Sequence, residues 1–111
     1  MIVGILPNGS TAEILLNNLS EADFDLTQVS VIMRDLEQRN AITQDGGPFQ
    51  GADLNTISDR LIHAGLSSND ARLFREKVAE GKVLVAMTVP PDAQAAAVEM
   101  FQDHSAEMIR E

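Results

Sequence analysis

Residues 65–87 constrain the fold most strongly, because they combine a capped helix, a glycine and an apolar strand in direct succession. Ser67 and Asp70 have the spacing of a helix N-cap and an acidic residue in the first turn. Gly81 stands where a helix commonly ends in a left-handed residue. The strand expected at 82–89 is apolar at nearly every position, with Val83, Val85, Met87 and Val89 on one face and Leu84, Ala86 and Thr88 on the other. Such a strand needs cover on both sides.

The N-terminal third of the chain predicts a β-α-β unit. Residues 2–6 form an apolar strand, and residues 28–34 form a second strand with one apolar and one mixed face. Between them, Ser10 and Glu13 have the spacing of a capping box, which predicts Ser10 as the N-cap of a helix. This helix ends near 23–25, and its inward residues are Ala12, Leu15, Leu16 and Leu19.

The same order of elements recurs at the C-terminal end. After the strand at 82–89, Pro91 is well placed at the first position of a last helix. The tail at 106–110 fits either an edge strand or a continuing helix, and the repeated order of elements favours the strand. The inner face of the last helix consists of Ala93, Ala97, Met100 and Phe101.

Two further helices are expected between these halves. Asp53 can cap a helix that Gly65 ends, and the next helix begins after Ser67. Residues 36–52 are polar and rich in turn formers, which predicts a flexible loop before the helix pair. The inward residues of the two helices are Leu54, Ile57, Leu61 and Ala64 in the first and Ala71, Phe74 and Val78 in the second.

Together these elements predict one α+β domain over residues 1–111 with a ferredoxin-like plan. Two β-α-β units give an antiparallel sheet of four strands in the order 4-1-3-2, with two helices on one face. The helix pair at 53–80 is then an insertion between the units. Because the central strands are apolar on both faces, either this pair or a second subunit must cover the second face of the sheet.

The composition argues against several function classes. The chain has no cysteine, which removes disulfides, thiolate catalysis and zinc–thiolate sites. Seventeen acidic against eight basic residues give a formal charge of −9, which disfavours binding to nucleic acid and to anionic membrane surfaces. Apolar runs are too short for a membrane span, and no signal peptide is recognisable. We therefore expect a soluble cytoplasmic protein that needs no cofactor.

The two histidines are better explained as surface and helix-end residues than as catalytic groups. His63 falls on the outer side of the inserted helix, and the carboxylate of Asp59 four residues earlier is its only nearby partner. A metal ligand or a general base would need further partners. His104 ends the last helix, where a cationic imidazole would interact favourably with the helix dipole.

Carboxylate pairs and one glycine-rich stretch are the remaining candidates. Asp23 with Asp25, and Asp35 with Glu37, lie in expected loops, where an acid–base pair would lack a pocket that separates the two pKa values. No segment has the spacing of a calcium loop. The stretch at 45–51 lacks the lysine of a phosphate-binding loop, so we interpret it as a linker. We assign no catalytic, cofactor-binding or metal-binding residue.

Core and turn residues over most of the chain carry a family resemblance: Ile2 to Ile5, Ala12, Leu15, Leu16, Leu19, Phe24, Val29 to Asp35, Gly65, Leu66, Ala71, Phe74, Gly81 and Val83 to Met87. In these residues the chain resembles the bacterial heat-induced or general stress proteins of the YflT type. The resemblance implies a small α/β domain linked to the stress response, with no established enzymatic activity. Many such proteins carry a glycine- and alanine-rich apolar segment between the halves, where this chain has the polar stretch 40–52.

We expect a non-enzymatic, stress-associated module that acts by self-association, as a homodimer, or by binding a protein partner. The apolar second face of the sheet and the lack of a reactive cluster lead to this expectation. A small-molecule sensor with its ligand between the sheet and the inserted helices is the alternative. A cofactor-independent enzyme of the ferredoxin-like kind is the third hypothesis. Such enzymes carry their active-site side chains on the open sheet face, and here that face would offer mainly valine and methionine.

Overall fold

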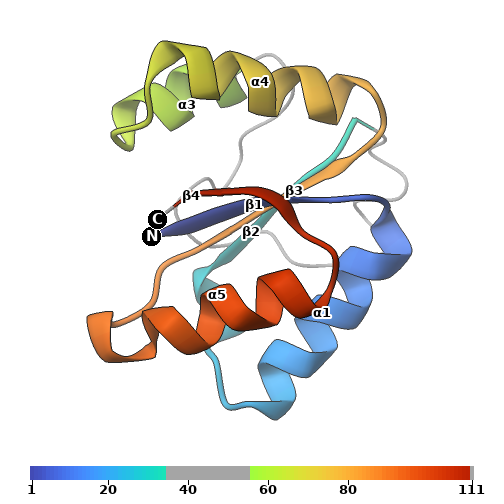
Figure 1. Ribbon diagram of the computed structural model, residues 1–111, viewed down its shortest axis with the longest axis vertical. Helices are drawn as coiled ribbons and strands as arrows, with labels where there is room; N and C mark the ends of the chain where they lie inside the picture. The colour runs from blue at the N-terminus through green and yellow to red at the C-terminus, as the bar shows by residue number, and fades with distance from the viewer. Residues whose placement is uncertain (35–55, 111) are drawn as a thin grey trace.

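In the part of the chain that the structure describes, four strands form one antiparallel sheet that lies between two pairs of helices (Figure 1). The structure, a computed structural model, describes residues 1–34 and 56–110. In chain order the elements are β1 (Ile2–Leu6), α1 (Gly9–Glu21), η1 (Leu26–Gln28), β2 (Val29–Ile32), α3 (Ile57–His63), α4 (Ser68–Ala79), β3 (Val83–Met87), η2 (Pro91–Ala93), α5 (Gln94–Asp103) and β4 (Glu107–Arg110), where η marks a short 3-10 helix.

Several expectations fall outside the described residues. They are the flexible loop at 36–52, the helix cap Asp53, the pair Asp35 and Glu37, and the glycine-rich stretch at 45–51.

The two β-α-β units interleave within the sheet. The strands lie in the order β2-β3-β1-β4, and every neighbouring pair is antiparallel. Counted from the β4 edge, this is 4-1-3-2. The apolar strands β1 and β3 are therefore the central ones, with Ile2 opposite Met87 and Leu6 opposite Val83. The tail forms β4, which confirms the strand and excludes the continuing helix.

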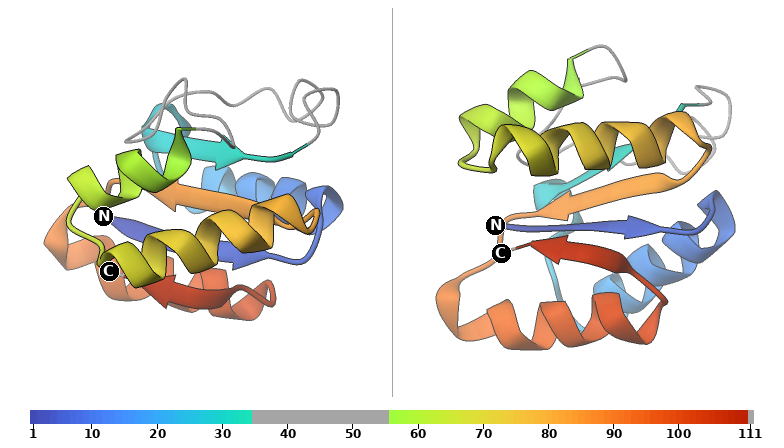
Figure 2. Two further views of the ribbon diagram at one scale, coloured as in Figure 1. Left: turned by 90° about the horizontal axis from the view of Figure 1, so that it is seen from above. Right: turned by 45° about the horizontal axis from the view of Figure 1, so that its top comes forward.

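Helices α1 and α5 cover one face of the sheet (Figure 2). A Cβ atom at Gly4 of β1 would lie only 2.8 Å from Cδ2 of Phe101, so the missing side chain makes room for this ring. The buried residues of this layer are Ile2, Leu6, Ala12, Leu15, Leu16, Leu19, Val29, Val31, Met33, Val83, Val85, Met87, Ala97 and Phe101.

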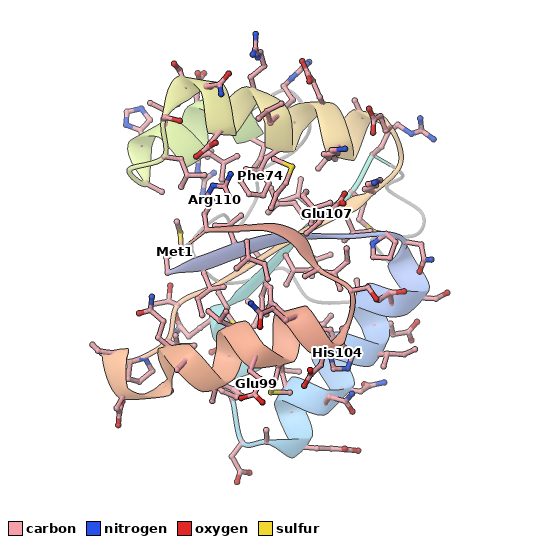
Figure 3. The ribbon with its side chains drawn as sticks, in the orientation of Figure 1. Met1, Phe74, Glu99, His104, Glu107 and Arg110 are labelled. Atoms are coloured by element: carbon pink, nitrogen blue, oxygen red, sulfur yellow. The ribbon has the colours of Figure 1, made fainter. Side chains whose placement is uncertain are left out.

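The inserted helices α3 and α4 cover the opposite face (Figure 1). Phe74 points from α4 towards the sheet and is fully buried (Figure 3). The buried residues of this second layer are Val3, Ile5, Ile32, Ile57, Leu61, Ala71, Phe74, Val78, Leu84 and Ala86. Of the two ways to cover the second face, the chain uses its own helix pair.

All four α-helices of the described residues end in the same backbone motif, in which the chain turns back through a left-handed residue. Gly65 and Gly81 take this position after α3 and α4, at φ +106° and +104°, as their sequence positions predict. Asp23 and Ser105 take it after α1 and α5, at φ 66° and 65°. A side chain is strained in this conformation, so neither residue type predicts the motif at these two positions.

The capping box predicted at Ser10 is wrong, because α1 begins two residues earlier. Asn8 is the N-cap, and its side-chain oxygen accepts a hydrogen bond from the backbone N–H of Thr11 at 2.8 Å. An asparagine caps a helix as well as a serine does, so the spacing alone did not separate the two. The predicted cap at Ser67 is confirmed, since its hydroxyl accepts from the backbone N–H of Asp70 at 3.1 Å.

Strands β2 and β3 are shorter than the predicted spans 28–34 and 82–89. After β3 the chain passes through Thr88 and Val89 to Pro90, which has no N–H for a sheet hydrogen bond. The helical turn beginning at Pro91 is a 3-10 turn that leads into α5.

Gly4→Ala should lower the free energy of unfolding by about 1–3 kcal/mol, because the new methyl group displaces the Phe101 ring. Urea unfolding of the variant and the parent protein measures the loss. Adding Phe101→Leu should make the combined loss smaller than the sum of the two single losses. Strictly additive losses, or no loss in Gly4→Ala, would contradict the close packing of Phe101 on β1.

Candidate functional site

A half-open groove of about 650 Å³ lies where α1 ends, β2 begins and β3 leads into η2. The end of α1 and the turn before α5 lie on the same side of the sheet (Figure 1). The lining of the groove is mostly apolar and consists of Ala22, Asp23, Phe24, Asp25, Gln28, Met87, Thr88, Val89, Pro90 and Ala93. This volume falls within the range of small-molecule sites, about 300–1,000 Å³.

The segment after α1 forms one wall of the groove through two local motifs. The left-handed Asp23 reverses the chain, and the backbone N–H of Phe24 then donates to the carbonyl of Leu19 at 3.0 Å. Asp25 next caps η1, where its Oδ1 accepts from the backbone N–H and the hydroxyl of Thr27 at 2.9 and 2.6 Å. The two motifs hold Phe24 half-buried at the groove, between two aspartates.

The opposite wall comes from the end of β3 and the proline turn that follows. Met87 is buried and Val89 is half-buried, and both side chains pack in the core layer on the side of α1 and α5. The backbone N–H of Thr88 donates to the carbonyl of Gln28 at 3.1 Å and ties this wall to the start of β2. Pro90 and Ala93 complete the lining at the entry to α5.

The charged side chains that the described residues bring to the groove are acidic. Two aspartates line it, and none of the lining residues within 1–34 and 56–110 is a lysine, arginine or histidine. Hydrogen bonds from the side chain and the backbone of Thr27 hold the pKa of Asp25 below its ordinary value of 3.8, so this carboxylate is ionised at neutral pH. The Asp23 carboxylate makes no ion pair with any residue in the described ranges.

A smaller hollow of about 330 Å³ lies near the chain ends, between the α3–α4 turn and β4. Arg110 on its wall already pairs with Asp70, with Nε 3.1 Å from Oδ2. The Asp70 carboxylate therefore anchors β4 to α4 through Arg110, which Figure 3 shows on β4 facing α4. This hollow is more polar than the groove, and an internal ion pair occupies its charged groups.

The two histidines considered in the sequence lie in different parts of the structure. His63 is exposed on α3, as expected, and so is Asp59. The ring of His104, half-buried at the end of α5 (Figure 3), bridges two helices: Nδ1 lies 2.6 Å from the carbonyl oxygen of Met100 and Nε2 2.6 Å from Nδ2 of Asn18 on α1. These contacts are structural. Within the described part of the chain, no three His, Asp or Glu residues gather in a way that could hold a metal ion.

Sequence reasoning named two residues of the groove but missed the groove itself. Asp23 and Asp25 stood out as a carboxylate pair in a loop, and the structure places both on the groove. The other wall comes from residues 87–93, which are distant in sequence. A local pattern cannot show that two such segments enclose a hollow.

No family model, curated protein or solved structure matches this chain. The likeness to general stress proteins therefore stays a prediction from the residues. None of the helices in the described ranges has the length and apolar character that crossing a bilayer requires.

The edge strand β4 is held by an ion pair whose pKa shifts can be tested. Nζ of Lys82 lies 2.8 Å from Oε1 of Glu107, and this hydrogen bond holds the Glu107 pKa below its ordinary 4.5 and the Lys82 pKa above its ordinary 10.5. An acid whose pKa is lowered in the folded protein stabilises the fold at pH values above its ordinary pKa, and this stabilisation is lost as the pH falls through the lowered pKa. A lysine whose pKa is raised stabilises the fold at pH values below its ordinary pKa, and this stabilisation is lost as the pH rises through the raised pKa.

Lys82→Met should return the Glu107 pKa towards 4.5, because it removes the hydrogen-bond donor. Carboxyl-selective NMR titration of both proteins measures this shift. The Asp25 carboxyl is the internal control. Its lowered pKa comes from the hydrogen bonds of Thr27 alone, so Lys82→Met should leave the Asp25 pKa unchanged. A Glu107 that titrates at its ordinary value in the parent protein would rule out the ion pair in solution.

Proposed function

We propose that this protein is a small-molecule-binding module whose ligand occupies the groove between the end of α1 and the β3–η2 turn. The observation that carries the proposal is the groove itself: a hollow of about 650 Å³ with a mostly apolar lining and a few polar groups at its rim. A ferredoxin-like plan with an inserted helix pair is the architecture that we assign to the module. The strand order and the two β-α-β units support this assignment.

Self-association is a weaker proposal than the sequence suggests. The expectation of a dimer rested on an uncovered apolar face, and α3 and α4 cover that face. The β4 edge is also poorly suited to pairing with a second sheet, because its register with β1 is irregular and Met108 has φ 55°. Irregular edge strands with charged residues resist such pairing.

Catalysis is likewise less well supported than binding. Proton transfer at neutral pH needs a group whose pKa lies near neutrality, and the pKa of Asp25 is lowered, away from it. None of the described residues that line the groove is a histidine, lysine or serine. A link to the stress response rests on the resemblance alone and remains part of the proposal.

The alternative place for a ligand, between the sheet and the inserted helices, has little support. Ile57, Leu61, Phe74 and Val78 fill this layer, and each is fully buried. Met33 and Met87 belong to the other layer, beneath α1 and α5.

The test is binding of a neutral aromatic probe, 4-phenylbutanol, followed by amide and methyl chemical shifts. We expect the shifts to centre on Phe24, Met87 and Val89. Ala93→Phe should weaken binding about tenfold or more, because a phenyl group at this lining position fills part of the groove. Ala96→Phe is the matched control, since Ala96 is exposed on α5 and lies outside the lining.

Two results would count against the proposed site. One is probe binding that Ala93→Phe leaves unchanged. The other is a set of shifts centred on a different part of the molecule.

A further inference from the structure

We propose that the groove selects amphipathic cations: small molecules in which an ammonium or guanidinium group is attached to an apolar body. This inference rests on the proposed function and names the class of its ligand. It follows from which charges the groove has, from Phe24 at its wall, and from the apolar surface opposite.

The charge of the groove excludes anions and favours cations. Among the described residues that line it, Asp23 and Asp25 are the charged ones. Oδ1 of Asp25 is engaged by Thr27, whereas the Asp23 carboxylate has no ion-pair partner within the described residues. A ligand cation would therefore meet an uncompensated negative charge. The formal net charge of −9 adds a long-range attraction of the same sign.

Phe24 adds a second means of holding a cation. It lies between the two aspartates in sequence, lines the groove and is half-buried against the core beneath α1. The face of an aromatic ring attracts a cation within about 6 Å. An aromatic ring beside carboxylates is a combination that binds quaternary and primary ammonium groups.

The apolar part of the ligand has its own surface. Met87, Val89 and Ala93 line the groove on the side of β3 and η2. Burial of apolar ligand surface here contributes to affinity whatever the charge of the ligand. Charge decides selectivity, and apolar contact supplies the part of the affinity that cationic and neutral ligands share.

Three probes with one apolar body separate these contributions: 4-phenylbutylamine, 4-phenylbutanol and 4-phenylbutanoate, which are cationic, neutral and anionic at pH 7. At about 20 mM salt we expect the amine to bind on the order of tenfold more tightly than the alcohol. Raising the salt to about 300 mM should reduce this preference severalfold. The carboxylate should bind more weakly than the alcohol.

The double variant Asp23→Asn with Asp25→Asn should remove most of the preference for the amine over the alcohol, measured as the ratio of the two affinities. An asparagine oxygen at position 25 can still accept the hydrogen bonds of Thr27, which preserves the cap. Asp59→Asn, which removes one negative charge on exposed α3 across the sheet, is the control and should retain the preference. Phe24→Leu should reduce amine binding more than alcohol binding.

Each result has a definite meaning. Equal affinity for amine and alcohol in the parent protein, or tighter binding of the carboxylate, overturns the cation selectivity but leaves the groove as a binding site. Failure of both amine and alcohol to shift groove resonances overturns the proposed function together with this inference. A preference for the amine that survives the double variant shows that the two aspartates do not select the ligand, and so also overturns the inference.

Discussion

The sheet of this protein is buried on both of its faces, and the arrangement of the helices follows from this. The central strands β1 and β3 carry buried apolar residues on alternate sides, so neither face of the sheet can be left to water. Helices α1 and α5 close one face, and the inserted α3 and α4 close the other (Figure 2). With both faces occupied, a binding site has to lie at an end or an edge of the sheet.

The groove meets this condition, because it is formed by segments that leave the sheet and its helices. The strained Asp23 turn, the Asp25 cap and the proline turn after β3 each end or begin an element, and together they enclose a hollow. Their charged groups remain at the surface, where ionisation has a low cost. The apolar residues of the lining continue the core outward, since Phe24 and Val89 pack against it.

Much of the fold follows from the sequence because apolar periodicity and helix-end glycines are local signals. The strand at 2–6, the cap at Ser67 and the turn at Gly81 all appear where these signals place them. Asn8 was missed because a serine caps a helix equally well, and the left-handed turn at Asp23 was missed because residues other than glycine rarely adopt this conformation. The groove could not be predicted, since its two walls meet only after the sheet has brought residues 22–28 and 87–93 together.

The fold depends on the packing of α4 against the second sheet face, and Phe74 lies at the centre of this contact. Its side chain is fully buried in the layer formed with Val3, Ile5 and Leu84. The measurement is the free energy of unfolding of Phe74→Ala in urea. We expect a loss of about 3–5 kcal/mol, because the substitution leaves a cavity in a fully buried layer. A loss below about 1 kcal/mol, as for an exposed side chain, would show that α4 does not close the sheet.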